Sequence, residues 1–324
     1  MGQLIKLQDY VSRYEQDIYA YPTRFVRLKK DQWEGMKDHW SQGPVSKVSD
    51  EDNNINRRSE KVPLFEKLKE LISFKTKGRE DSKTEDIPPS ASSLDPIIPA
   101  SIDSIEKLKK YFLDQLLPFQ LKWASSTLTE KSFLDRSYLN DERLKFLLQR
   151  LPDTFLILYK PIFLLKNASV ETDVILITPT GIWSLAFLET EQDTVFIGSK
   201  ERFWVKRTGE IEGKLLNPLI GLNRTDQIVR KLFQVAEIDL PVHKALITMD
   251  GYIDFPSRPY DTNFVEKRDF DEWFKSLRSL KSPLKHMQLK AALALLQHCR
   301  TQSVRRPEWE IHNESERWSQ VEDK

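Results

Sequence analysis

Cysteine, histidine and long apolar runs are all scarce in this 324-residue chain, which has one cysteine, Cys299, and five histidines. A single thiol excludes an internal disulfide and fits a reducing compartment, and so few thiols and imidazoles argue against a structural zinc site. The longest apolar run, residues 155–165, is interrupted by Lys160-Pro161 and is shorter than the roughly 20 residues that span a bilayer. The first six residues show no apolar core of signal-peptide length. We therefore expect a cytoplasmic protein without a membrane partner.

An excess of charge of one sign is also lacking, because the chain has 50 Lys and Arg and 49 Asp and Glu, which give a net charge of +1. A surface that attracts nucleic acid must then be local. One such run is residues 24–30, in which Arg24, Arg27, Lys29 and Lys30 alternate with apolar residues. These cations could contact phosphates. In the simpler interpretation, the segment is amphipathic, docks on the main domain and leaves its cations solvated.

The composition changes along the chain and predicts four regions. Residues 1–43 form a small helical, basic-aromatic unit, because Leu4, Leu7, Val11, Tyr14 and Ile18 recur at helical spacing. Residues 44–100 are a flexible linker: 18 of the 36 residues from 51 to 86 are charged, and four prolines follow in 87–100. A short apolar helix near 63–74 interrupts the linker and could bind a partner protein. Residues 101–300 form an α/β domain with its core at about 140–280, and 301–324 are a polar tail.

The α/β prediction rests on short apolar runs bounded by turn residues, alternating with amphipathic segments. The expected strands are 155–159 with a continuation at 162–165, 174–177, 182–188, 194–197, 203–207 and 244–249. The expected helices begin near 103 and 142 and cover about 219–235, 271–280 and 288–297. This order predicts a mixed central sheet flanked by helices.

Two carboxylates stand where adjacent predicted strands end. Asp173 opens the strand 174–177, and Glu189 closes the strand 182–188 after the turn 178–181. One or two carboxylates with waters suit Mg²⁺, which can activate water against a phosphodiester. If the turn has four residues, Ile177 pairs with Ile182, and alternation directs Asp173 and Glu189 to opposite faces. A shared site then needs a bulge or a strong local twist.

This arrangement resembles the nuclease-related domain (NERD) family, which is related to the PD-(D/E)xK nucleases. The resemblance covers about 140–280. Glu142 fits the glutamate of the family's N-terminal helix, Asp173 its strand aspartate, Gly181 its turn, Glu189 the glutamate of Glu-x-Lys, and Asn217-Pro218 its helix lead-in. It implies a restriction-endonuclease-like fold, a catalytic role for Asp173, Glu189 and Glu142, and Mg²⁺ or Mn²⁺ at Asp173 and Glu189 if the site is active.

The sequence departs from the family at two positions. Glu191 stands at the lysine position, where it reverses the charge and would repel a phosphate. Gly221 stands where the family's helix commonly has glutamine. Lys200 or Lys206 could replace the missing lysine in space, and both are also candidates for contact with nucleic acid.

The sequence is compatible with three functions, and the missing lysine argues against an active enzyme. The first is a catalytically impaired nuclease-fold module that binds DNA, RNA or a protein partner. The second is an active metal-dependent nuclease with a relocated lysine. The third is a structural or regulatory interaction module that uses the N-terminal unit or the linker helix and binds no nucleic acid.

Overall fold

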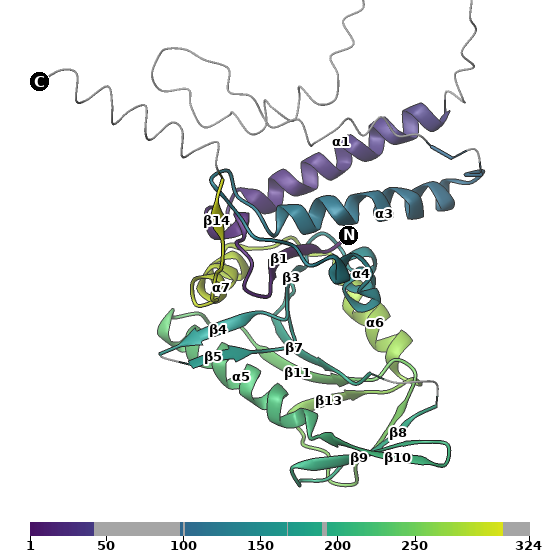
Figure 1. Cartoon of the computed structure of the whole chain (residues 1–324), viewed down its shortest axis with the longest axis vertical. Coiled ribbons are helices and arrows are strands. Elements are labelled where there is room, and N and C mark those ends of the chain that lie inside the picture. The colour runs from purple at the N-terminus through teal and green to yellow at the C-terminus, as the bar shows by residue number, and fades with distance from the viewer. Residues whose placement is uncertain (42–97, 100, 167, 190–192, 307–324) are drawn as a thin grey trace, which may run out of the picture. The chain divides into compact units, whose positions relative to one another are not determined.

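A six-stranded mixed sheet is the centre of the α/β fold (Figure 1). The structure is a computed structural model and describes residues 1–41, 98–99, 101–166, 168–189 and 193–306. The chain divides into two compact units, residues 1–22 with 116–324, and residues 23–115. The short helix expected near 63–74 and most of the tail expected at 301–324 lie outside the described residues, and the four-region division stays a prediction.

The central sheet belongs to the larger unit and combines parallel with antiparallel pairs. Its strands, in spatial order, are β1 (Gln3–Leu7), β3 (Leu156–Tyr159), β6 (Val174–Ile177), β7 (Ile182–Phe187), β11 (Val242–Ile247) and β13 (Thr262–Val265). The β3–β6–β7 strands form an antiparallel meander, whereas β1 runs parallel to β3 and β11 runs parallel to both β7 and β13. The predicted mixed sheet is thus confirmed.

Helices cover both faces of this sheet. They are α4 (Glu142–Arg150), α5 (Pro218–Val235), α6 (Phe270–Arg278) and α7 (His286–Gln297). Side chains of α4 and α6 share one apolar cluster with Leu176, Leu185 and Ile247 of the sheet. On the other face α5 packs against β7 and β11, with α7 beside α5. Short elements complete the unit: η1 (Arg13–Glu15), η2 (Arg136–Leu139), the pair β4 (Ile162–Leu165) and β5 (Ala168–Glu171), and the pair β2 (Glu130–Lys131) and β14 (Val304–Arg305).

A second, four-stranded sheet follows β7 in the chain. Its spatial order is β10 (Ile211–Leu216), β9 (Phe203–Thr208), β8 (Val195–Ile197) and β12 (Tyr252–Asp254). One face is buried through Phe196, Trp204 and Ile253, which pack with Leu219 and Leu222 of α5. The opposite face is the more exposed one.

The N-terminal segment differs from its prediction. Residues 3–7 form β1, a strand with every residue buried, and the expected helix over residues 4–18 is absent there. Lys6 is fully buried, and its ammonium donates hydrogen bonds to Glu15 Oε1 at 2.6 Å and Thr301 Oγ1 at 2.8 Å. The Gln3 side chain donates to the backbone oxygen of Asp153 at 2.7 Å. These partners satisfy polar groups that would otherwise make burial costly.

The smaller unit, residues 23–115, contains most of α1 (Tyr21–Ser41) and the first half of α3 (Ile105–Trp123). Within it the rings of Trp33 and Phe112 lie 5.4 Å apart, and Trp40 donates its indole N–H to the backbone oxygen of Ile102 at 2.9 Å. The helix α3 continues through Pro118, where the sequence predicts an end or a kink. None of the described helices is long and apolar enough to cross a bilayer.

Candidate functional site

Asp173 lies at the entry to β6 and joins the ends of three neighbouring strands. Its backbone oxygen accepts a hydrogen bond from the Lys160 N–H, just after β3, at 2.6 Å. Its carboxylate Oδ2 accepts from the Phe187 N–H at the end of β7, at 2.9 Å. Its side chain is 26% exposed. The carboxylate is therefore fixed at the edge of the sheet and mostly shielded from solvent.

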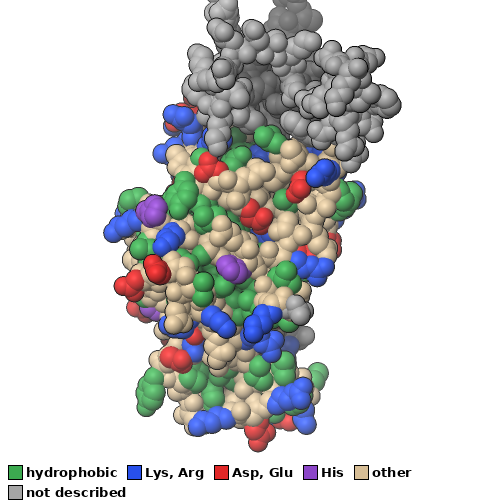
Figure 2. Space-filling view, turned by 90° about the vertical axis from the view of Figure 1, so that its left-hand side faces the viewer, with side chains coloured by type: hydrophobic (Ala, Val, Ile, Leu, Met, Phe, Trp, Pro, Cys, Tyr) green, Lys and Arg blue, Asp and Glu red, His purple; other side chains and the backbone are tan. Residues whose placement is uncertain are grey.

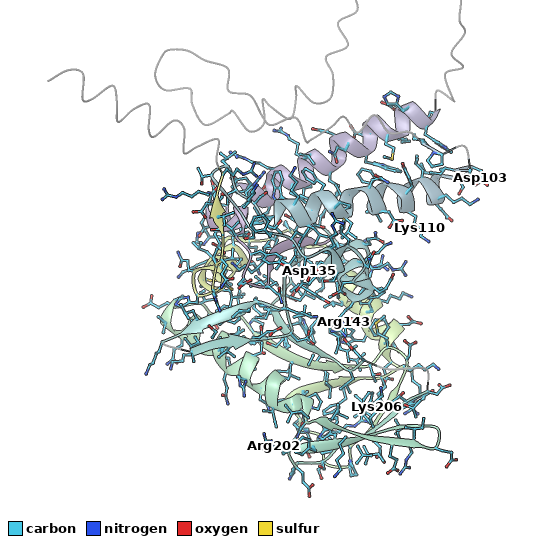
Figure 3. The ribbon with its side chains drawn as sticks, viewed as in Figure 1. Asp103, Lys110, Asp135, Arg143, Arg202 and Lys206 are labelled. Atoms are coloured by element: carbon cyan, nitrogen blue, oxygen red, sulfur yellow. The ribbon has the colours of Figure 1, made fainter. Side chains whose placement is uncertain are left out.

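Arg143 brings a positive charge between the two predicted carboxylates. Asp141 caps α4 by accepting a hydrogen bond from the Leu144 N–H, as expected for an N-cap aspartate. From the first turn of this helix, the Arg143 guanidinium reaches Glu189 Oε1 at 2.8 Å and Asp173 Oδ1 at 3.7 Å. It also lies over the Phe187 ring, 4.9 Å from its centre. Figure 3 labels Arg143 beside the central strands.

The hairpin register shows how Asp173 and Glu189 come to share one partner. Ile177 pairs with Ile182, as a four-residue turn requires. Gly181 suits this turn because an added Cβ would lie 2.8 Å from the Pro241 backbone oxygen. Asp173 precedes β6 and Glu189 lies two residues beyond β7, so alternation within the strands does not fix their side chains. The long Arg143 side chain then reaches both carboxylates, and no bulge is needed.

A tyrosine and a lysine at the end of β3 extend the cluster. Tyr159 donates its hydroxyl to Asp141 Oδ2 at 2.7 Å, and burial together with this bond raises the pKa of Tyr159 above its usual range. Lys160 follows with a positive φ of 49°. Non-glycine residues rarely adopt this conformation, and those that do are commonly found at functional sites. The positive charge of Lys160 acts on Asp173. The cluster thus contains two cations and three carboxylates around the strand ends.

The pKa of the Asp173 carboxyl is raised above its ordinary value. Burial is the main cause, because it penalises the charged form, and the charge of Glu189 acts in the same direction. The Phe187 N–H and the charges of Arg143 and Lys160 oppose the shift without cancelling it. A perturbed carboxyl among specific charge partners is a common property of functional sites.

The raised pKa predicts that Asp173→Asn stabilises the protein at neutral pH. In wild type the folded state carries a poorly solvated carboxylate at pH 7, whereas the amide is neutral and can still accept from Phe187. The gain should disappear as pH falls through the raised folded pKa towards about 4, where the wild-type carboxyl becomes protonated in both states. Thermal unfolding from pH 8 to pH 4 measures this, with exposed Asp239→Asn as the control. A lower Tm at pH 7 would show that the Arg143 ion pair outweighs burial.

The residues present do not fit a resident divalent cation in this arrangement. A metal between Asp173 and Glu189 would lie against the Arg143 guanidinium, which already occupies both carboxylates. Within the part of the chain that the structure describes, no three His, Cys, Asp or Glu side chains gather as a metal site. Mg²⁺ or Mn²⁺ at this position therefore stays a prediction from the family resemblance.

The other predicted site residues lie apart from this cluster or outside the described residues. Glu142 is exposed in the first turn of α4, where its neighbour Arg143 makes the contacts. Glu191 is outside the described residues. Gly221 is exposed on α5 with open space where a side chain would be. Asn217 caps α5 through the Leu219 N–H and donates to the backbone oxygen of Glu201, so its role in the structure is local.

The predicted basic residues fall on two different elements. Arg24, Arg27, Lys29 and Lys30 lie on α1, where the intervening Phe25 and Leu28 are buried. Lys200 precedes β9 and Lys206 lies within it, on the second sheet (Figure 3).

The sequence predicts Asp173 and Glu189 as site residues, and their role stays a prediction; Arg143, Lys160 and Tyr159, which the structure places beside them, were not predicted. Two signals could have pointed to them. Asp141 is a good helix cap, which places Arg143 in the first turn of the helix. The Lys160-Pro161 break between two apolar runs marks a strand end, where polar side chains of neighbouring strands meet.

The fold and the site together define an α/β domain with paired carboxylates at the ends of adjacent strands. The family model of the nuclease-related domain, NERD, matches residues 136–249 of this chain. A Geobacillus stearothermophilus protein named RNA 2',3'-cyclic phosphodiesterase is 60% identical over 40 residues, which cover 12% of this chain and 13% of that protein. No solved structure matches the chain.

Proposed function

We propose that this nuclease-related domain binds nucleic acid at the Arg143 cluster and cuts it poorly or not at all. The observation that supports this is the Arg143 guanidinium, which is paired with both Asp173 and Glu189. A guanidinium is suited to bidentate recognition of phosphate.

A phosphate can compete for Arg143 because one of its present partners is weakly held. The Glu189 side chain is 83% exposed, and an ion pair to such a group contributes about 0–1 kcal/mol. A phosphodiester that displaces Glu189 would meet Arg143, with Lys160 near Asp173 as a second cation. The Phe187 ring under the guanidinium holds it in place.

Poor cleavage follows from the same arrangement. Hydrolysis of a phosphodiester by this class of site requires an activated water and a stabilised charge. Here Asp173 and Glu189 pair with a guanidinium, and Glu191 replaces the lysine of the related nucleases. RNA as the ligand is in keeping with the similarity, over 40 residues, to a protein named RNA 2',3'-cyclic phosphodiesterase.

A second candidate, an active nuclease with a relocated lysine, is favoured by one specific observation. Lys160 donates its backbone N–H to the Asp173 backbone oxygen, and its side-chain charge acts on the Asp173 carboxyl. It is therefore a better placed replacement than Lys206, which lies in β9 of the second sheet, or Lys200, which precedes β9.

The test is binding of a fluorescent RNA or DNA oligonucleotide, measured by anisotropy over a salt series. Arg143→Ala and Lys160→Ala are each expected to weaken binding about 10- to 100-fold, as for loss of a hydrogen bond to a charged group. Each should lower the salt slope by about one. Lys281→Ala is the control for the loss of one positive charge, because Lys281 is an exposed lysine beyond α6. Absence of binding by folded wild type would refute the proposal. Unchanged affinity in both variants would show that nucleic acid does not bind at the Arg143 cluster.

A further inference from the structure

The outer face of the second sheet is open and carries apolar side chains. The register places alternate residues of β9 and β10 outward, opposite the buried Trp204. On this face Phe203 is 51% exposed and Leu216 is 53% exposed, and the two are paired across the strands. Exposed apolar neighbours of this kind commonly mark a binding surface.

Two arginine–aromatic pairs lie on this same outer face. The Arg202 guanidinium lies over the Phe203 ring, 5.6 Å from its centre. On β12, Tyr252 also points outward, because the next residue, Ile253, is buried, and Arg268 lies 5.5 Å from the centre of its ring. An aromatic ring beside an arginine offers a stacking surface and a cation together.

The charge of this segment differs from that of the whole chain. Residues 200–216, which include β9 and β10, hold five Lys and Arg and three Asp and Glu, while the whole chain has a net charge of +1. Lys214 is exposed on the outer face, while Arg207 is paired with Glu212. In Figure 2 hydrophobic and Lys/Arg side chains lie side by side at the lower end of the view, where Figure 1 places β8, β9 and β10.

We propose that this outer face, defined by Phe203, Leu216, Lys214 and Tyr252 with Arg202 and Arg268, binds single-stranded nucleic acid. The inference rests on the proposed function and names its ligand class. A duplex hides the faces of its bases, so exposed rings contribute little to binding it, whereas unpaired bases can stack on Phe203 and Tyr252. Arg202 and Lys214 would contact the backbone phosphates, whereas Arg268 also pairs with Glu266 at 3.2 Å.

The chain also links this face to the Arg143 cluster. β8 begins at Val195, six positions after Glu189. A protein strand added to the edge of β10 is the competing occupant, because β10 lies at the edge of its sheet. However, β10 carries Glu212 and Lys214, and charges on an edge strand oppose such pairing. The observations therefore favour a nucleic acid over a protein.

The experiment compares wild type, Phe203→Ala and Phe203→Trp with a fluorescent single-stranded oligouridine of about 20 nucleotides and with the matched RNA duplex. Phe203→Ala should weaken single-strand binding about 5- to 100-fold, since loss of one aromatic platform removes one stacked base, and Phe203→Trp should retain it. Duplex binding should change less than twofold. Phe133→Ala is the matched control, because Phe133 is 74% exposed and also lies beside a cation, Lys131.

The outcomes separate this inference from the proposed function. If wild type binds neither ligand, both fail. If wild type binds and Arg143→Ala weakens binding while Phe203→Ala does not, only the outer-face inference is overturned. Equal losses in Phe203→Ala and the Phe133→Ala control would also overturn it. Concentration-dependent self-association that Phe203→Ala abolishes, without any effect on RNA affinity, would assign the face to a protein contact instead.

Discussion

Ile175→Asp is expected to abolish cooperative folding of the α/β domain at 25 °C. Ile175 has no exposed surface and lies in β6, paired with Leu158 on one side and Ser184 on the other. An aspartate there buries an unpaired charge and leaves a poorly filled core. We expect a loss of at least about 4–5 kcal/mol, a large part of the total stability of a typical domain.

Circular dichroism during urea unfolding measures this loss, and Ile211→Asp is the matched control. Ile211 is 74% exposed in β10, so the same chemical change should alter stability by about 0.5 kcal/mol or less. A normal unfolding midpoint for Ile175→Asp would contradict the central position of β6. An equal loss in both variants would show that aspartate acts through strand propensity, not burial.

Wild-type protein is expected to show little or no cleavage of DNA or RNA with Mg²⁺ or Mn²⁺. The resemblance to the PD-(D/E)xK nucleases assigns Glu191, and with it a negative charge, to the position of their lysine. A unit charge at about 5 Å, with an effective dielectric near 20, is worth roughly 3 kcal/mol. A loss of about 2–6 kcal/mol in the transition state lowers the rate roughly 10¹- to 10⁴-fold.

Two substitutions made together should restore cleavage activity. Glu191→Lys alone is expected to give little gain, because Arg143 still pairs with Asp173 and Glu189. Arg143→Ala with Glu191→Lys frees both carboxylates, and cleavage should rise at least about tenfold over either single variant if charge is the main defect. Cleavage by wild type that Asp173→Ala abolishes would refute the expectation and point to Lys160, whose replacement by alanine would then also abolish it.

The middle of the fold was predictable because its signals are local. The strand 174–177, the turn with Gly181 and the strand beginning at Ile182 each combine a short apolar run with turn residues, and the structure confirms all three. The helix after Asn217 also begins and ends close to its predicted bounds, since an Asn cap followed by proline is a strong start signal.

The N-terminal strand was not predictable from the same rules. Both of its faces are buried, so it has no alternation, and the spacing of Leu4, Leu7 and Val11 mimics a helix. Its polar residues find partners far away in the sequence, as Lys6 does at Thr301. Spacing within a short window carries no information about such partners.

The grouping of side chains around Asp173 could be inferred from the sequence only in part, for a similar reason. Asp173 and Glu189 stand at strand ends that the sequence marks clearly. Arg143 belongs to a helix about 30 residues before Asp173, and only the packing of α4 on the sheet shows that its side chain reaches the strand ends.

The position of β1 has a consequence for how the chain folds as it is synthesised. β1 is synthesised about 150 residues before its partner β3, because Gln3 pairs with Leu156. The β3–β6–β7 meander needs only short loops and can form early, whereas closing so long a loop is slow. Until β3 emerges from the ribosome, the apolar residues of β1 have no sheet to join. The nascent chain therefore exposes an unpaired apolar segment while about 150 further residues are synthesised, which favours aggregation during that time.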